Sequence, residues 1–188
     1  MNTIRKTCLV AFSCLLCEAG LSREVGGLSL PESIKVGDKT LTLNGAGLRT
    51  RYIIGVKVYV AGLYLESVSR DAAAVVSSDQ VKRVQLTFLR ALDREQITDA
   101  IGKGFERNSK EQMSALKARL EKLQGFIPDV AAGDKLEITY VSGKGTTLTV
   151  KGEEKGTIEG KDFSDALFSV WLGRDPVDED LKKALLGD

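Results

Sequence analysis

Two donor side chains in one apolar stretch offer the clearest chemistry in this sequence. Arg49 follows the Gly-Ala-Gly segment at residues 45–47, and Tyr59 lies ten residues further along the chain. An arginine offers a planar fork of N–H donors, and a tyrosine hydroxyl adds a directed neutral donor. Beside an apolar wall, such a pair would bind a carboxylate or stabilise an enolate. We therefore take Arg49 and Tyr59 as the candidate ligand-binding pair.

The stretch that holds both donors, residues 43–66, is rich in β-branched and aromatic residues and predicts extended chain. Its alternation places two sets of side chains on opposite faces, an expected core face with Ile54, Val56, Val58, Val60 and Tyr64, and an expected cleft face with Lys57, Tyr59, Ala61 and Leu63. A straight strand would separate Arg49 from Tyr59 by roughly 33 Å. The two meet only if the chain reverses or bends sharply near Gly55. Otherwise Arg49 is a surface or ion-paired residue and Tyr59 a packed core tyrosine.

Composition narrows the classes of function. The 188 residues suffice for one domain with a hydrophobic core. The 27 basic and 26 acidic residues nearly balance, and no basic patch with interleaved aromatic residues indicates nucleic-acid binding. The sequence contains no histidine, which excludes a histidine-dependent catalytic triad and a histidine zinc site. No cofactor is implied.

The first 19 residues predict a secretory signal peptide. Arg5 and Lys6 supply its charged start, residues 8–16 its apolar core, and a small-residue cleavage site ends at Ala19. The apolar run is too short to cross a membrane, so we expect no stable membrane insertion. All three cysteines lie in this segment, and the mature chain would have no thiol. We expect a secreted, periplasmic protein; the alternatives are an uncleaved N-terminus on a cytosolic protein and a lipid anchor.

The remaining chain predicts a polar, glycine-rich lead over residues 20–27 and a single α+β domain over residues 28–188. Segments with strand and helix periodicity follow in the order strands, helices, strands, helices, which favours an antiparallel sheet with helices layered on one face. Asp93 and Gln96 have the spacing of a capping box. The helix that they begin carries one apolar stripe, formed by Ile97, Ala100, Ile101, Gly104 and Phe105.

Three expectations concern the C-terminal third of the sequence. Residues 152–156 predict a turn between strands. Asp162 is expected to cap the next helix, and a last helix is expected to start at Asp175 and Pro176.

Two motifs together resemble the chalcone isomerase-like family. They are residues 44–49 (Asn-Gly-Ala-Gly-Leu-Arg) and residues 56–65 (Val-Lys-Val-Tyr-Val-Ala-Gly-Leu-Tyr-Leu), and the resemblance extends over about residues 28–186. The family includes plant chalcone isomerases, plant fatty-acid-binding proteins of the same fold, and bacterial members. The resemblance implies an open-faced β-sandwich with its ligand cleft between the sheet and the helices.

The resemblance also implies roles for single residues. The arginine characteristic of the family falls on Arg49. The next ligand-contacting position falls on Tyr59, and this position is a tyrosine that helps to hold the fatty-acid carboxylate in the fatty-acid-binding branch. A late serine or threonine that helps isomerases to bind flavanone falls near Ser164. The substrate-orienting tyrosine, lysine and asparagine of the isomerases are replaced by Ile97, Ala100 and Gly104. We therefore do not expect efficient chalcone isomerase activity.

The sequence and the resemblance favour a non-catalytic binding protein for a small amphipathic carboxylic acid, a fatty acid being the expected ligand. Arg49 and Tyr59 would hold the carboxylate, and Ile97 and Ile101 would contribute an apolar wall. One alternative is an isomerase or intramolecular lyase in which Arg49 stabilises an oxyanion. A further alternative is a structural or partner-binding protein whose cleft is filled by its own side chains.

Overall fold

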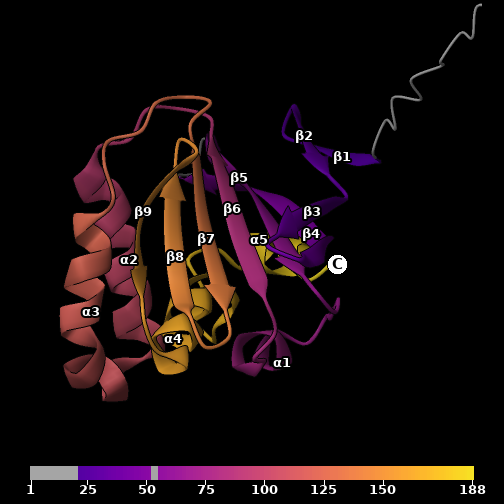
Figure 1. Cartoon of the computed structure of the whole chain (residues 1–188). Coiled ribbons are helices and arrows are strands. Elements are labelled where there is room, and N and C mark those ends of the chain that lie inside the picture. The colour runs from indigo at the N-terminus through magenta and orange to yellow at the C-terminus, as the bar shows by residue number, and fades with distance from the viewer. Residues whose placement is uncertain (1–20, 52–54) are drawn as a thin grey trace, which may run out of the picture.

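The structure, a computed structural model, describes residues 21–51 and 55–188, and Figure 1 shows the arrangement of its elements. The strands in these residues are β1 (Ser22–Val25), β2 (Leu28–Pro31), β3 (Ser33–Val36), β4 (Lys39–Arg51), β5 (Val56–Leu65), β6 (Lys82–Phe88), β7 (Lys135–Val141), β8 (Gly145–Val150) and β9 (Glu153–Ile158). The helices are α1 (Ala72–Ser77), α2 (Arg94–Asn108), α3 (Met113–Gly125), α4 (Lys161–Leu172) and α5 (Glu179–Leu185), with a 3₁₀ turn (Lys110–Gln112) before α3. The predicted signal peptide lies outside the described residues.

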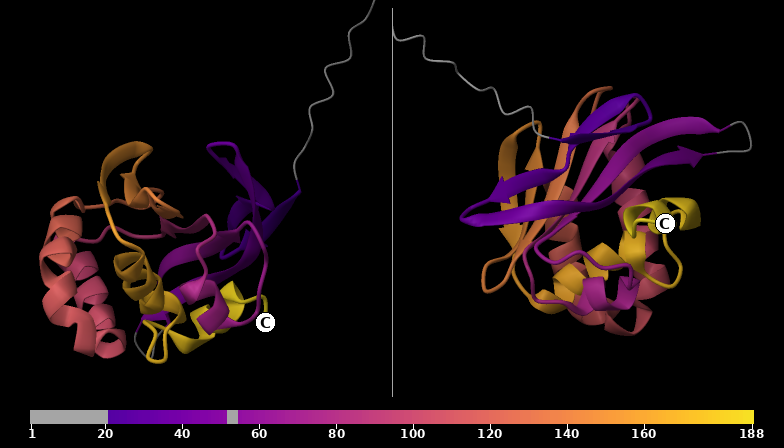
Figure 2. Two further views of the ribbon diagram at one scale, coloured as in Figure 1. Left: turned by 60° about the horizontal axis from the view of Figure 1, so that its bottom comes forward. Right: turned by 90° about the vertical axis from the view of Figure 1, so that its right-hand side faces the viewer.

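Strands β3 to β9 form one seven-stranded antiparallel sheet, in which the spatial order of the strands is their order in the chain. Strands β1 and β2 form a separate hairpin. The helices cover one face of the curled sheet, and the hairpin lies on the other side (Figure 2). The main core fills the space between sheet and helices, and a smaller apolar cluster lies between sheet and hairpin. This arrangement confirms the predicted α+β class with helices layered on one face of an antiparallel sheet.

Strand β5 buries both of its faces, which differs from the expected division into core and cleft. The set expected to line a cleft contributes Tyr59, Ala61 and Leu63 to the main core. Val60 and Tyr64, from the expected core face, belong to the smaller cluster beneath the hairpin. Val58 departs from the alternation and joins the main core, because the β4–β5 register shifts beside it and forms a bulge.

The N-terminal lead contains a strand that the sequence analysis did not predict. Residues 22–25 form β1, which pairs with β2 in an antiparallel hairpin. Leu30 of this hairpin is 3% exposed and packs with Leu41 and Leu43 of β4. Burial stabilises the hairpin, because the hairpin covers the apolar side chains on the face of the sheet that carries no helices.

The prediction of a turn over residues 152–156 was wrong. The turn is shorter, because Lys151 and Gly152 both have positive φ, 57° and 80°. Two such residues form the tight connection of a β-hairpin, and β9 therefore starts at Glu153.

Two helices begin at other residues than the sequence predicted. Gly160 rather than Asp162 precedes α4, because the Asp162 carboxylate lies in the first turn and accepts a hydrogen bond from Arg119 Nη2 at 2.6 Å. Helix α5 begins at Glu179, three residues after Pro176, because the Asp178 side chain accepts a hydrogen bond from the N–H of Leu181 at 2.9 Å and caps the helix there.

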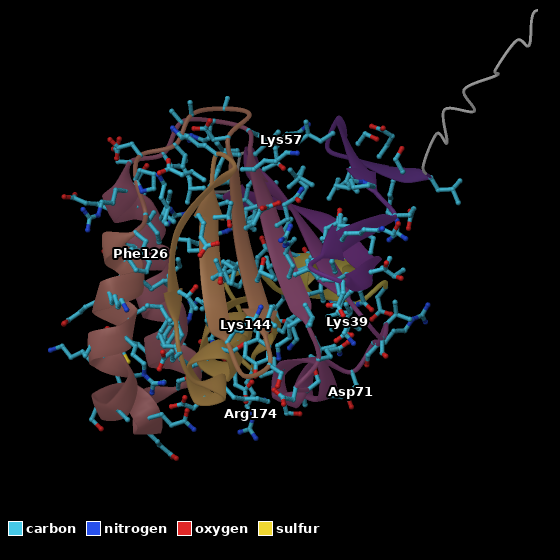
Figure 3. All side chains as sticks on the ribbon, viewed as in Figure 1. Lys39, Lys57, Asp71, Phe126, Lys144 and Arg174 are labelled. Carbon is cyan, nitrogen blue, oxygen red and sulfur yellow. The ribbon has the colours of Figure 1, made fainter. Side chains whose placement is uncertain are left out.

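Helix α2 has the predicted capping box of Asp93 and Gln96. Its apolar stripe is buried against the sheet and α4, with Ile97, Ile101, Gly104 and Phe105 inside. Helix α3 packs beside the edge strand β9, where Figure 3 shows Phe126 at the end of the helix. Among residues 21–51 and 55–188, no helix has the length and apolar character needed to span a membrane.

Candidate functional site

Arg49 on β4 and Tyr59 on β5 lie directly opposite each other in the antiparallel pair. The chain reverses between the two strands, and Gly55, where the reversal was expected, has a φ of 66° that glycine adopts at low cost. Residues 52–54 of this connection lie outside the described residues. The ζ carbon of Arg49 lies 5.5 Å from the centroid of the Tyr59 ring. The structure therefore brings the two predicted donors together.

The Gly-Ala-Gly segment before Arg49 allows α5 to pack closely onto β4. A Cβ on Gly45 would collide with the backbone oxygen of Ala184, and a Cβ on Gly47 would lie 2.7 Å from the Cβ of Ala184. The Nδ2 of Asn44 donates to a backbone carbonyl of α5 at 2.8 Å and strengthens the same contact. This part of the motif therefore has a structural role, since it fixes the strand that presents Arg49.

The Tyr59 side chain is buried, with 4% of its surface exposed. Its hydroxyl oxygen accepts a hydrogen bond from the indole Nε1 of Trp171 at 3.0 Å. Burial raises the pKa of the phenol, and the positive charge of Arg49 opposes this rise. The phenol is therefore neutral at physiological pH and keeps its hydrogen for donation.

Arg49 is half-buried and carries an uncompensated charge. Of the carboxylates in the described residues, none lies within ion-pair distance of its guanidinium. The contact with the Tyr59 ring stabilises the cation without neutralising it. Partial removal of a charge from water costs free energy unless an opposite charge compensates it, so an anionic ligand would be stabilised here.

A cavity between the sheet and helices α2 and α4 adjoins this pair. Most of its walls are apolar, and they include Val58, Leu86, Ile97, Ile101, Val170 and Trp171. The space inside is about 40 Å³, whereas pockets for small molecules usually enclose roughly 300–1,000 Å³. In this structure, the cavity therefore has room for no more than a few water molecules.

Four of the five residues predicted to bind a ligand line this cavity: Arg49, Tyr59, Ile97 and Ile101. Ser164 is not among the lining residues. It is fully buried in the first half of α4, and its hydroxyl has no hydrogen-bond partner among the described residues. The structure therefore does not bring Ser164 to the other four.

The sequence analysis did not single out Val170 and Trp171, which form part of the cavity wall. A usable signal was present, because a buried indole N–H usually finds an acceptor. The sequence contains one tryptophan, so the acceptor had to be sought for this residue alone. Which acceptor it finds depends on how α4 crosses the sheet.

A second polar cluster surrounds Lys82 of β6, which lies opposite Tyr140 of β7 in the sheet. The ammonium group of Lys82 is fully buried and donates to the backbone oxygens of Val75, Val76 and Ser78 at 3.0, 2.6 and 3.0 Å. These donations satisfy the carbonyl groups at the end of α1. Burial lowers the pKa of Lys82 to about 8, and the carboxylate of Asp165 opposes this shift.

Comparisons with known proteins agree with the architecture of the sheet and helices. A family model described as chalcone isomerase-like matches residues 22–187, which is nearly all of the described chain. The chain belongs to the chalcone isomerase-like family. Among solved structures, a fatty-acid binding protein from Arabidopsis thaliana is similar, with a TM-score of 0.68 and 17% sequence identity over 85% of this chain and 92% of that one. No curated protein sequence matches.

Membership of the chalcone isomerase-like family allows a test of the isomerase alternative. Of the positions where isomerases carry their substrate-orienting residues, Ile97 and Ala100 line the cavity, and Gly104 packs against Val170. Besides Tyr59 and the two arginines, Arg49 and Arg51, the polar lining side chains of the described residues are Gln96 and the indole of Trp171. None of these lining side chains is a carboxylate.

Proposed function

We propose that this chalcone isomerase-like protein binds a small amphipathic carboxylic acid, most simply a fatty acid, and does not transform it. The observation that carries the proposal is the half-buried guanidinium of Arg49, which lies without a carboxylate partner among the described residues over the buried Tyr59. A ligand carboxylate would accept charge-assisted hydrogen bonds from Arg49 and a further one from the Tyr59 hydroxyl. The apolar tail would then extend between the sheet and α2.

The similar fold of the Arabidopsis fatty-acid binding protein supports a ligand of the same class. The small cavity adds a condition, because a fatty-acid tail does not fit into about 40 Å³. Binding therefore requires Ile97 and Ile101 of α2 to move away from the sheet. Such opening on ligand binding is expected where the open state is a minor conformation of the free protein.

The small volume of the cavity also favours a second candidate, a structural or partner-binding protein whose cleft is filled by its own side chains. Trp171 and Val170 of α4 line this small cavity opposite the sheet and leave no room for a ligand tail. In that case, the free protein would take up no acid at all, which distinguishes the two candidates experimentally.

Native mass spectrometry of the protein as purified, followed by organic extraction, tests the proposal. The expected result is a co-purifying acid that is lost in Arg49→Ala. Lys57→Ala is the matched control, because Lys57 is an exposed cation on β5 that does not line the cavity. For added fatty acids, the Arg49 variant should bind about ten- to a hundredfold more weakly. A clean mass in all samples and no uptake of added fatty acids would reject the binding function.

We also propose that the protein acts in the periplasm after removal of residues 1–19. The same mass spectra test this localisation, because a chain processed as predicted would start at Gly20. An intact N-terminus on protein from the native host would reject it. Binding in solution does not depend on this result.

A further inference from the structure

The hydrogen bond between Trp171 and Tyr59 restricts what the Tyr59 hydroxyl can do. It joins α4 to β5, 112 residues apart in the chain, and both side chains are buried, with exposed fractions of 3% and 4%. An indole N–H can only donate, so the phenol oxygen must be the acceptor. The phenol hydrogen then lies away from Trp171.

The guanidinium of Arg49, the cation beside the phenol, favours the same orientation of the hydroxyl. The cation of Arg49 favours the electron-rich oxygen and repels the hydroxyl hydrogen. Among the described residues, no acceptor takes this hydrogen. Arg49 itself offers only donors. Arg49 and Tyr59 therefore both present hydrogen-bond donors to the cavity. Among the described side chains that line it, the acceptor oxygen of Gln96 already accepts a hydrogen bond from the N–H of Asp93 at 3.2 Å.

We propose that Trp171 is a positioning residue that keeps Tyr59 in its donor orientation and thereby makes the site selective for ionised carboxylates. This inference rests on the proposed binding function. A carboxylate accepts hydrogen bonds and gives none, so it satisfies a site made of donors. An alcohol or a protonated acid with the same tail brings a hydrogen of its own, which would lie buried without an acceptor. Such an unsatisfied group weakens binding by about tenfold or more.

Trp171→Phe tests the inference because it removes the N–H and keeps an aromatic ring in the cavity wall. The Tyr59 hydroxyl can then turn and accept a hydrogen bond from an alcohol. We expect the ratio of decanoate to decanol affinity, measured by titration calorimetry, to fall by about tenfold relative to the unmodified protein. Phe163→Leu is the control, because Phe163 is buried on the same helix but does not line the cavity; its ratio should stay unchanged.

Tyr59→Phe shows whether Trp171 acts through its hydrogen bond to the Tyr59 hydroxyl or only through its packing in the cavity wall. If Trp171 acts through the hydroxyl, Tyr59→Phe should lower the same ratio, and adding Trp171→Phe to it should lower the ratio no further. A ratio that Trp171→Phe leaves unchanged, in a protein that binds decanoate, would overturn the inference and leave the binding function intact. If the unmodified protein binds neither compound, the binding function itself fails.

A measurement on the unmodified protein covers the case in which Trp171→Phe does not fold. The single tryptophan gives one indole N–H signal in a heteronuclear NMR spectrum. When decanoate binds, this hydrogen should remain protected from exchange with solvent, because Tyr59 continues to accept it. Loss of protection in the complex would show that Trp171 releases Tyr59 on binding, and would overturn the inference.

Discussion

Arg49 faces Tyr59 across β4 and β5, and its guanidinium carbon lies 5.5 Å from the centre of the phenol ring. The ring stabilises the arginine through its π electrons and leaves the N–H donors unused by any carboxylate of the described residues. A cation in this position can bind an anionic ligand, but it adds little to the stability of the ligand-free protein. The first prediction follows from this difference.

Arg49→Met should leave the free energy of unfolding unchanged or raise it by up to about 1 kcal/mol, because it removes an uncompensated charge and keeps an apolar side chain against Tyr59. Urea denaturation of ligand-free protein measures the change. Arg119→Met is the comparison and should lower stability, since Arg119 donates to both carboxylate oxygens of Asp162. A loss of stability in Arg49→Met larger than that of the Arg119 variant would show that Arg49 is a structural residue.

Ile101→Ala should enlarge the cavity and shift binding towards acids with bulkier tails. Ile101 is 4% exposed and lines the cavity, whereas Ile127 is 2% exposed and lies outside it. Each alanine substitution should lower the free energy of unfolding by about 2–5 kcal/mol. The relative affinity for branched and linear fatty acids should change only in Ile101→Ala. The same change in the Ile127 variant would contradict a tail site beside α2.

Two glycines of α2 should respond in opposite ways to alanine. A Cβ on Gly104 would lie 2.8 Å from Cγ1 of Val170, so Gly104→Ala should separate α2 from α4 and lower stability by about 1–3 kcal/mol. At Gly102 the nearest atom, Nε2 of Gln124, is 3.5 Å away, and Gly102→Ala should raise stability by about 0.5–1 kcal/mol through helix propensity. Thermal unfolding of both variants measures the difference. Equal effects would contradict the close contact of the two helices.

The stability of the protein should increase at mildly alkaline pH because of Lys82. Its pKa is lowered from 10.5 to about 8 in the folded protein by burial. Between these values the unfolded chain binds more protons than the folded one, so the free energy of unfolding rises with pH. The expected rise between pH 8 and about pH 10 is about 2 kcal/mol. Tyr64 and Tyr140, whose pKa values are raised to about 12, begin to oppose it above pH 10.

Urea denaturation across this pH range, with Lys82→Met as the control, measures the contribution of Lys82. The variant leaves the carbonyl oxygens of Val75, Val76 and Ser78 without their donor, so it should be less stable at pH 8. It should also lack the increase in the free energy of unfolding with pH that Lys82 provides. Identical pH profiles for the two proteins would show that the three carbonyls keep the ammonium charged in the folded state.

Much of the fold followed from local patterns in the chain. Alternation predicted the strands, the spacing of Asp93 and Gln96 predicted the capping box of α2, and the order of elements predicted the α+β class. These features depend on neighbours within a few residues. The less accurate predictions concerned element ends, such as the start of α4, where an ion pair between Asp162 and Arg119 across 43 residues of chain competes with a local cap.

The sequence by itself determined that Arg49 and Tyr59 are available as donors, that they meet only if the chain reverses near Gly55, and that no histidine can take part. Only the tertiary structure decided that Trp171 donates to Tyr59, that Ser164 lies apart from the cavity, and that the cavity has a volume of only about 40 Å³. The physical reason is distance along the chain. Residue types and short spacings are written in the sequence, whereas contacts between α4 and β5 depend on how the helices pack across the whole sheet.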